Sequence, residues 1–132
     1  MEVYIVKGKD PYKTAKELLE RMRFSLRDKK VLIKPNMTYP ATSEDGITTD
    51  IDIVKVILEK LKNCDVVIGD AGTDAKKAFE LNGYYELASD FNAKVIDFDR
   101  EGIIVNKRIP KPFRYEELPI AKNVLECEYL IN

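Results

Sequence analysis

The chain has 132 residues, which suits one ordinary domain, and its 45% hydrophobic residues can build a sizeable core. Charged residues make up 34% but nearly cancel at a net charge of −1, so we expect neither nucleic acid nor an acidic membrane surface as a partner. The absence of histidine excludes His-based triads and His-ligated metals, and two cysteines are too few for an iron–sulfur cluster within this chain.

The N-terminal third predicts a strand, a helix and a second strand. Glu2–Lys7 (EVYIVK) is β-branched and aromatic, as in strands. Asp10 and Pro11 suit a helix start, because Asp caps free amides and the missing N–H of Pro is harmless in the first turn. Lys30–Lys34 encloses the apolar run VLI, which is typical of a strand covered on both faces. No apolar run approaches the roughly 18 residues of a membrane-spanning helix, and the N-terminus does not resemble a signal peptide, so we expect a cytoplasmic protein.

A long polar segment, Pro35–Thr48, comes next and is either a binding loop or lid, or a mere excursion of the chain. We expect Thr48 or Thr49 to cap the following helix. The buried stripe of that helix is Ile53, Val54, Ile57, Leu58 and Leu61.

The C-terminal half predicts further strands and helices in alternation. Strands are expected at Asp65–Gly69, Ala93–Phe98 and Tyr129–Ile131, with a further short strand at Ile103–Val105. Helices are expected from Gly72-Thr73-Asp74 to Leu81, over Tyr84–Phe91, and over Ile120–Glu126, with Asn82-Gly83 as a stop signal. Pro110, Pro112 and Pro119 indicate extended, looped chain.

This alternation predicts a single α/β domain over residues 1–132. The expected architecture is three-layered and Rossmann-like, with a mainly parallel sheet of about four to five strands and helices on both faces. Leu61–Ile68 and Val124–Ile131 have similar patterns, in which a helix end runs through a cysteine into a strand. We interpret Cys64 and Cys127 as small buried hydrophobic residues at equivalent strand entries, not as reactive thiols.

Ligands of open parallel sheets bind outside the carboxyl ends of the strands. In this sequence those ends carry Lys34, Asn36, Asp70, Thr73, Asp97 and Asp99. The turn GDAGTD has two glycines, Gly69 and Gly72, and leads into a helix whose free amides can receive an anion; the alternative is a simple helix cap. The turn lacks the Gly-Lys-Ser/Thr of a P-loop and the third glycine of a dinucleotide fingerprint.

Two further readings of the strand ends stay open. Asp70, Asp97 and Asp99 supply oxygen ligands suited to Mg²⁺ or Mn²⁺, or they cap helices. Lys34 is either a charge clamp or base at a strand end, or an ordinary surface lysine.

Several of these segments together resemble the uncharacterised family known as "domain of unknown function 362". They are Lys30–Asn36 (KVLIKPN), Thr48-Thr49-Asp50, Val67–Gly72 (VIGDAG), Ala93–Asp97 and Ala121–Asn132. The family's signature positions fall on Lys34, Pro35, Asn36, Thr49, Gly69 and Asp70. Many members are longer and carry a ferredoxin-like module with 4Fe–4S motifs, so the resemblance implies redox work. Family members continue beyond a strand like Tyr129–Asn132, so we expect a naturally short member, a shortened chain, or one part of a split protein.

These observations support three hypotheses. The first is a ligand-binding domain of a redox-associated family, with an iron–sulfur partner protein or a second copy completing the site. Its expected ligand-binding residues are Lys34, Asn36, Thr49, Gly69, Asp70, Gly72 and Thr73. The second is a metal-assisted enzyme that uses Asp70 and Asp97 with Lys34. The third is a non-catalytic assembly domain that forms a homo-oligomer through an unfinished sheet edge.

Overall fold

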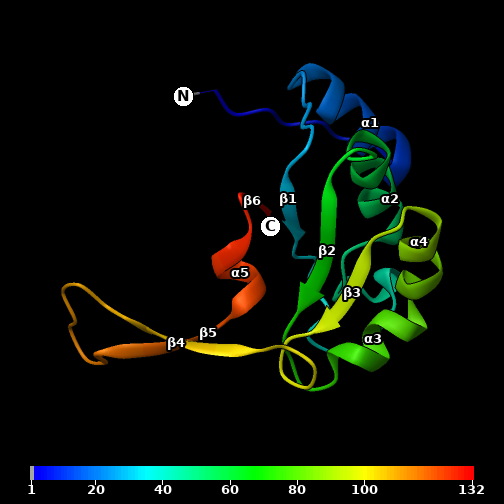
Figure 1. Cartoon of the computed structure of the whole chain (residues 1–132). Coiled ribbons are helices and arrows are strands. Elements are labelled where there is room, and N and C mark those ends of the chain that lie inside the picture. The colour runs from blue at the N-terminus through cyan, green and yellow to red at the C-terminus, as the bar shows by residue number, and fades with distance from the viewer. Residues whose placement is uncertain (1) are drawn as a thin grey trace.

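The computed structural model describes residues 2–132, which fold around a four-stranded parallel sheet (Figure 1). The strand order is β3-β2-β1-β6, and every neighbouring pair is parallel. The strands are β1 (Lys30–Ile33), β2 (Asp65–Asp70), β3 (Lys94–Asp97) and β6 (Tyr129–Ile131). The expected α/β architecture is therefore confirmed.

Three helices and an outer fourth cover the first face of the sheet. They are α2 (Ile51–Lys60), α3 (Ala75–Leu81) and α4 (Tyr84–Asp90), with α1 (Pro11–Arg21) packed outside α2. In α2, Val54 and Leu58 join the main core with Val31 and Ile33 of β1. Val56 joins a smaller cluster with Ala15 and Leu19 of α1. Helix α2 therefore has two apolar faces because it lies between the sheet and α1.

The second face has a thinner cover. Leu32 packs there with Phe98 and Ala121, next to α5 (Lys122–Glu126). The preceding strands β4 (Ile104–Arg108) and β5 (Glu117–Ala121) form a separate antiparallel hairpin that projects from the body (Figure 1). The strand expected at residues 103–105 is thus part of a hairpin, and Ile120 and Ala121 belong to β5 and not to the expected helix.

Two expectations about the N-terminal half were wrong. Glu2–Lys7 has no secondary structure, and the side chains of Val3 and Ile5 are 80% and 84% exposed. A strand needs a hydrogen-bonded neighbour, and no described strand pairs with this segment. The cap of α2 is Asp50, whose carboxylate accepts from the Asp52 amide, because the Thr49 hydroxyl is used elsewhere.

Other local signals were read correctly. Asp10 caps α1 by accepting from the Lys13 amide, and Pro11 opens the helix. Gly83 separates α3 from α4 with φ at +71°, a conformation that glycine adopts without strain. The two cysteines, which we expected to be buried, are instead half-buried free thiols, Cys64 beside the main core and Cys127 beside the cluster on the second face. Within residues 2–132, no helix is long and apolar enough to cross a membrane.

Candidate functional site

An ion pair between Lys34 and Asp70 lies at the C-terminal edge of the sheet. Lys34 directly follows β1, and Asp70 is the last residue of the neighbouring strand β2. The Lys34 Nζ lies 2.9 Å from the Asp70 Oδ1. Asp70 is only 1% exposed, whereas 38% of the Lys34 side chain is exposed. The ion pair therefore joins a buried carboxylate to an ammonium group that reaches solvent.

The backbone fixes both members of the pair. The other oxygen of Asp70, Oδ2, accepts from the amide of Met37 at 2.6 Å, and Met37 is fully buried. The amide of Lys34 donates to the carbonyl of Ile131 in β6 at 2.7 Å. Each oxygen of the buried carboxylate thus has a partner, as a buried charge requires.

The segment Pro35–Thr48 is a closed loop, not an open excursion. Asn36 and Thr49 join its ends: the Asn36 amide donates to the Thr49 hydroxyl at 2.9 Å, and the Thr49 amide donates to the Asn36 carbonyl at 3.1 Å. The Asn36 side chain also donates to the Ile47 carbonyl at 2.6 Å. A single 3-10 turn, Ser43–Asp45, lies within the loop. Asn36 and Thr49 therefore shape the loop beside Lys34.

The body of the loop is held against α3 and α4. The Thr73 amide donates to the Thr38 carbonyl at 3.0 Å, and a Cβ added at Gly72 would lie 2.5 Å from the Thr38 Cα. Only glycine permits this approach of two backbones. Tyr84 lies fully buried and donates its hydroxyl to the Thr49 carbonyl at 3.2 Å; burial, with the nearby Asp50 charge, raises the pKa of this phenol well above its usual range.

Carboxylates occupy amides of the GDAGTD turn and of the first turn of α3, and two of these carboxylates come from the end of β3 and the turn after it. The Gly72 amide donates to Asp99 Oδ2 at 2.9 Å. The Lys76 amide donates to Asp97 Oδ2 at 3.1 Å, and the Lys77 amide donates to Asp74 Oδ1. These contacts favour the helix-cap alternative at the start of α3, because an incoming anion would have to displace acidic side chains. Gly69 is also structural, since a Cβ there would lie 2.3 Å from the Phe98 ring.

The acidic residues at the strand ends are adjacent but turned to different partners. Asp70 and Asp97 are register partners in β2 and β3, and both are 1% exposed. Asp97 Oδ1 accepts from the amides of Asp99 and Arg100, which closes the turn after β3. Among residues 2–132, no three acidic, cysteine or histidine side chains form a group that could hold a metal ion.

The structure thus brings most of the expected binding residues to one edge of the sheet in different roles. Lys34 and Asp70 form the ion pair, and Asn36 and Thr49 join the ends of the loop. Gly72 and Thr73 contact the backbone of Thr38. Sequence reasoning missed Met37, Thr38 and Ile131. Met37 carried a signal, because a large apolar side chain inside a polar loop is typical of an anchored loop.

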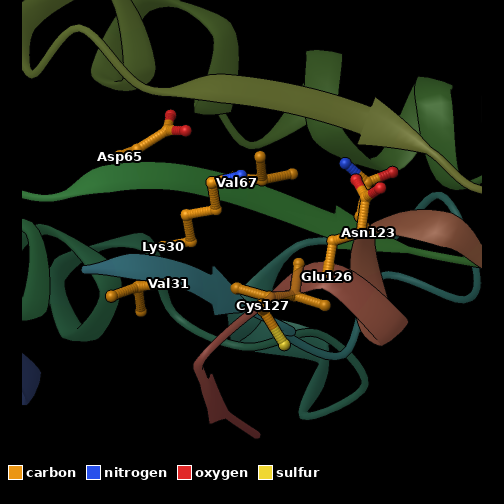
Figure 2. A pocket seen from close by; sticks show the side chains of 8 residues that line it. Lys30, Val31, Asp65, Val67, Asn123, Glu126 and Cys127 are labelled. Carbon is orange, nitrogen blue, oxygen red and sulfur yellow. The ribbon is translucent and has the colours of Figure 1, made fainter.

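A separate small hollow lies between α5 and the opening half of β1 and β2 (Figure 2). Its volume is about 90 Å³, and Lys30, Asp65, Glu126 and Cys127 lie around it. That volume holds about three waters, whereas pockets for drug-sized ligands begin at about 300 Å³. This hollow is therefore too small to be the site of such a ligand.

Comparison with known proteins identifies a family, but the description of that family names no activity. Residues 31–132 match the family model described as "Domain of unknown function (DUF362)". The matched range contains Lys34, Asp70 and the whole loop between β1 and α2. No curated protein and no solved structure matches the chain.

Proposed function

The chain belongs to the DUF362 family of unknown function, and we propose that it is a ligand-binding α/β domain that holds a carboxylate or carbonyl group at Lys34. The observation that carries this proposal is the Lys34–Asp70 pair, in which a solvent-reaching ammonium is fixed by a buried carboxylate. The pair lies where ligands of open parallel sheets bind.

The chemistry of the pair selects the kind of ligand group. An ammonium has three donors, and the structure gives Lys34 Nζ no acceptor besides Asp70 among residues 2–132. The other donors can bind an oxygen of a ligand. Since Lys34 and Asp70 neutralise each other, the site suits a carbonyl or a single carboxylate better than a doubly charged phosphate.

Preorganisation supports the same reading. A free lysine loses about 1.5–2 kcal/mol of side-chain entropy when it is immobilised. Asp70 already restrains Lys34, and the Met37 amide in turn restrains Asp70. A ligand that binds Lys34 therefore loses less affinity to ordering the protein.

The test is a titration of the full chain with acetate, propionate and inorganic phosphate, in which the NMR shifts of the amide and lysine signals are measured. We expect shifts at Lys34, Asn36 and Met37, with carboxylates binding more tightly than phosphate, and at least about tenfold weaker binding in Lys34→Met. Lys29→Met is the matched control, because Lys29 pairs with Glu128 at 2.9 Å and 40% exposure at the opposite end of β1. Equal binding by both variants, or no shift near Lys34 in the native chain, would refute the site.

A metal-assisted enzyme remains the second candidate because Asp70 and Asp97 are paired in register. To bind a cation, Asp70 must release Lys34 or the Met37 amide, and Asp97 must release an amide of the α3 start or of its own turn. Manganese should then broaden the amide signals of Met37 and Lys76 at equimolar concentration. Uniform, weak broadening over the surface would remove this candidate.

A redox role requires a partner protein in this proposal. The two cysteines lie beside different clusters on opposite faces of the sheet, so they do not form a shared site. Clusters of the 4Fe–4S type need about four cysteine ligands, which a ferredoxin-like partner carries. Native mass spectrometry of the purified protein tests this association, and a partner without iron and sulfide would count against it.

A further inference from the structure

We propose that the outer edge of β4 binds an extended acidic segment of a partner protein, which adds to the β4–β5 hairpin as a third strand. We call residues 103–121, which contain this hairpin, the arm. The inference is independent of the Lys34 site, because it concerns the arm that projects from the body of the molecule (Figure 1).

The arm is a two-stranded sheet without a core of its own. All five residues of β4 are exposed, and so are the first three of β5. Apolar side chains gather at its base, where Ile103, Ile104 and Val105 are 64%, 50% and 36% exposed. A hairpin of only two strands is marginally stable in water, and a third strand stabilises it. The arm therefore has the properties of an element that a partner completes.

The hydrogen bonds of the hairpin leave one edge of β4 open. The Ile109 amide donates to the Glu116 carbonyl at 2.8 Å, and the Lys122 amide donates to the Ile103 carbonyl at 2.7 Å. Bonded and non-bonded pairs alternate along an antiparallel ladder, so every second residue of β4 points its amide and carbonyl away from β5. These residues are Ile104, Asn106 and Arg108. Within residues 2–132, β5 is the only strand that pairs with β4.

A proline blocks the opposite edge of the arm. Pro119 lies opposite Asn106 in the register of the two strands. The nitrogen of proline carries no hydrogen, so the middle residue of β5 has no amide to donate to a further strand. β4 contains no proline. A third strand therefore adds to β4 and not to β5.

Charge indicates which kind of strand fits this edge. The arm has four basic side chains and two acidic ones, although the whole chain has a net charge of −1. The basic side chains lie at the end of β4 and in the loop after it, and they are Lys107, Arg108, Lys111 and Arg114. Within residues 2–132, none of them forms an ion pair with an acidic side chain. A strand that is acidic beside the tip of the arm and apolar beside its base therefore matches the whole edge.

A nucleic acid or an anionic membrane would use only some of these features. Both would bind the basic side chains, and the exposed rings of Phe113 and Tyr115 could stack on bases or enter a membrane interface. Neither presents a row of alternating donors and acceptors, which the open edge of β4 requires. An extended peptide supplies that row together with acidic and apolar side chains, so we assign the edge to a peptide segment.

The test uses the full chain and a peptide with blocked ends, EEETVTV, as the probe. Its glutamates come first, so that antiparallel addition to β4 places them beside the basic tip. On binding, we expect amide hydrogen exchange to slow at Asn106 and Arg108, which face outward. It should change little at Val105 and Lys107, whose amides already face β5. The control peptide KKKTVTV should bind at least about tenfold more weakly.

Replacement of Asn106 by proline tests the edge itself. Asn106→Pro removes an outward amide, as Pro119 does on β5, and leaves the bonds between the two strands in place. We expect peptide binding to weaken at least about tenfold. Asn106→Ala is the matched control, because it keeps the amide and should bind as the native chain does. Protected amides at Ile109 and Lys122 show that the hairpin persists, and the exchange pattern of the native chain tests the proposal without any variant.

Several results would overturn the proposal. One is no binding of EEETVTV, or equal binding of the two peptides. Another is slowed exchange in β6 in place of β4, since the peptide would then add to the main sheet. A third is a free chain that is already dimeric, with slow exchange at Asn106 before peptide is added. The last is tighter binding of a single-stranded oligothymidylate, or of phosphatidylserine vesicles, than of the acidic peptide.

Discussion

Replacement of Asp70 by alanine removes the group on which both the candidate site and its loop depend. Asp70 Oδ2 holds the Met37 amide and Oδ1 holds the Lys34 ammonium. Met37 is fully buried, so its amide loses its partner without gaining water. We therefore expect a loss of stability as well as a loss of ligand binding.

The magnitude follows from the two contacts. A hydrogen bond to a buried charged group contributes about 1.5–3 kcal/mol, which applies to the Met37 amide. The Lys34 contact contributes about 0.5–1 kcal/mol, because an ammonium exposed to this degree regains water. The free energy of unfolding should thus fall by about 3 kcal/mol. With a typical urea slope of about 2 kcal/mol per molar, the midpoint falls by about 1.5 M.

Urea unfolding followed by circular dichroism measures this change, and amide exchange at Met37 shows where it acts. Asp65→Ala is the matched control, because Asp65 is exposed at the other end of the same strand. Asp70→Asn should lose only about 1 kcal/mol, since its amide oxygen still accepts from Met37. If Asp70→Ala is no less stable than Asp65→Ala, the carboxylate does not anchor the loop and the reasoning fails.

Three further predictions address the loop and the sheet. Gly72→Ala should lower the free energy of unfolding by about 2 kcal/mol, because the Cβ would meet the Thr38 backbone; an unchanged urea midpoint would contradict that close approach. Tyr84→Phe should cost about 1 kcal/mol and speed amide exchange at Thr49, since the Thr49 carbonyl loses its donor; exchange unchanged there would place the hydroxyl elsewhere. A hydrogen bond from Lys29, with one from the Lys30 amide, holds the pKa of Glu128 below its usual range. Ionised Glu128 therefore stabilises the fold above the unfolded-state pKa of about 4.3, and this stabilisation is lost as the pH falls through the lower folded-state pKa. Below a pH of about 4.5, the unfolding midpoint of Glu128→Gln should therefore depend less on pH than the midpoint of the native chain.

The centre of the sheet was predictable because β1 and β2 bury side chains on both faces. The run Val31-Leu32-Ile33 is fully buried, as its continuous hydrophobicity predicted. The same reasoning was wrong for Glu2–Lys7, whose composition is equally strand-like. Composition reports whether a segment fits a sheet, but pairing depends on whether a neighbouring edge is within reach, which no local pattern contains. The β4–β5 hairpin was only half-foreseen for this reason, since Pro119 within β5 reads locally as loop.

The candidate site was predictable only as a region. Lys34 and Asp70 follow adjacent apolar runs, and the carboxyl ends of parallel strands share one edge, so their proximity followed from topology. The partners that fix them did not, because the Met37 amide and the Thr38 backbone reach the site through the fold of an irregular loop. The sequence also did not reveal which carboxylates accept from backbone amides. Asp97 and Asp99 accept from amides of α3 and of the turn before it, whereas Asp70 forms an ion pair with Lys34.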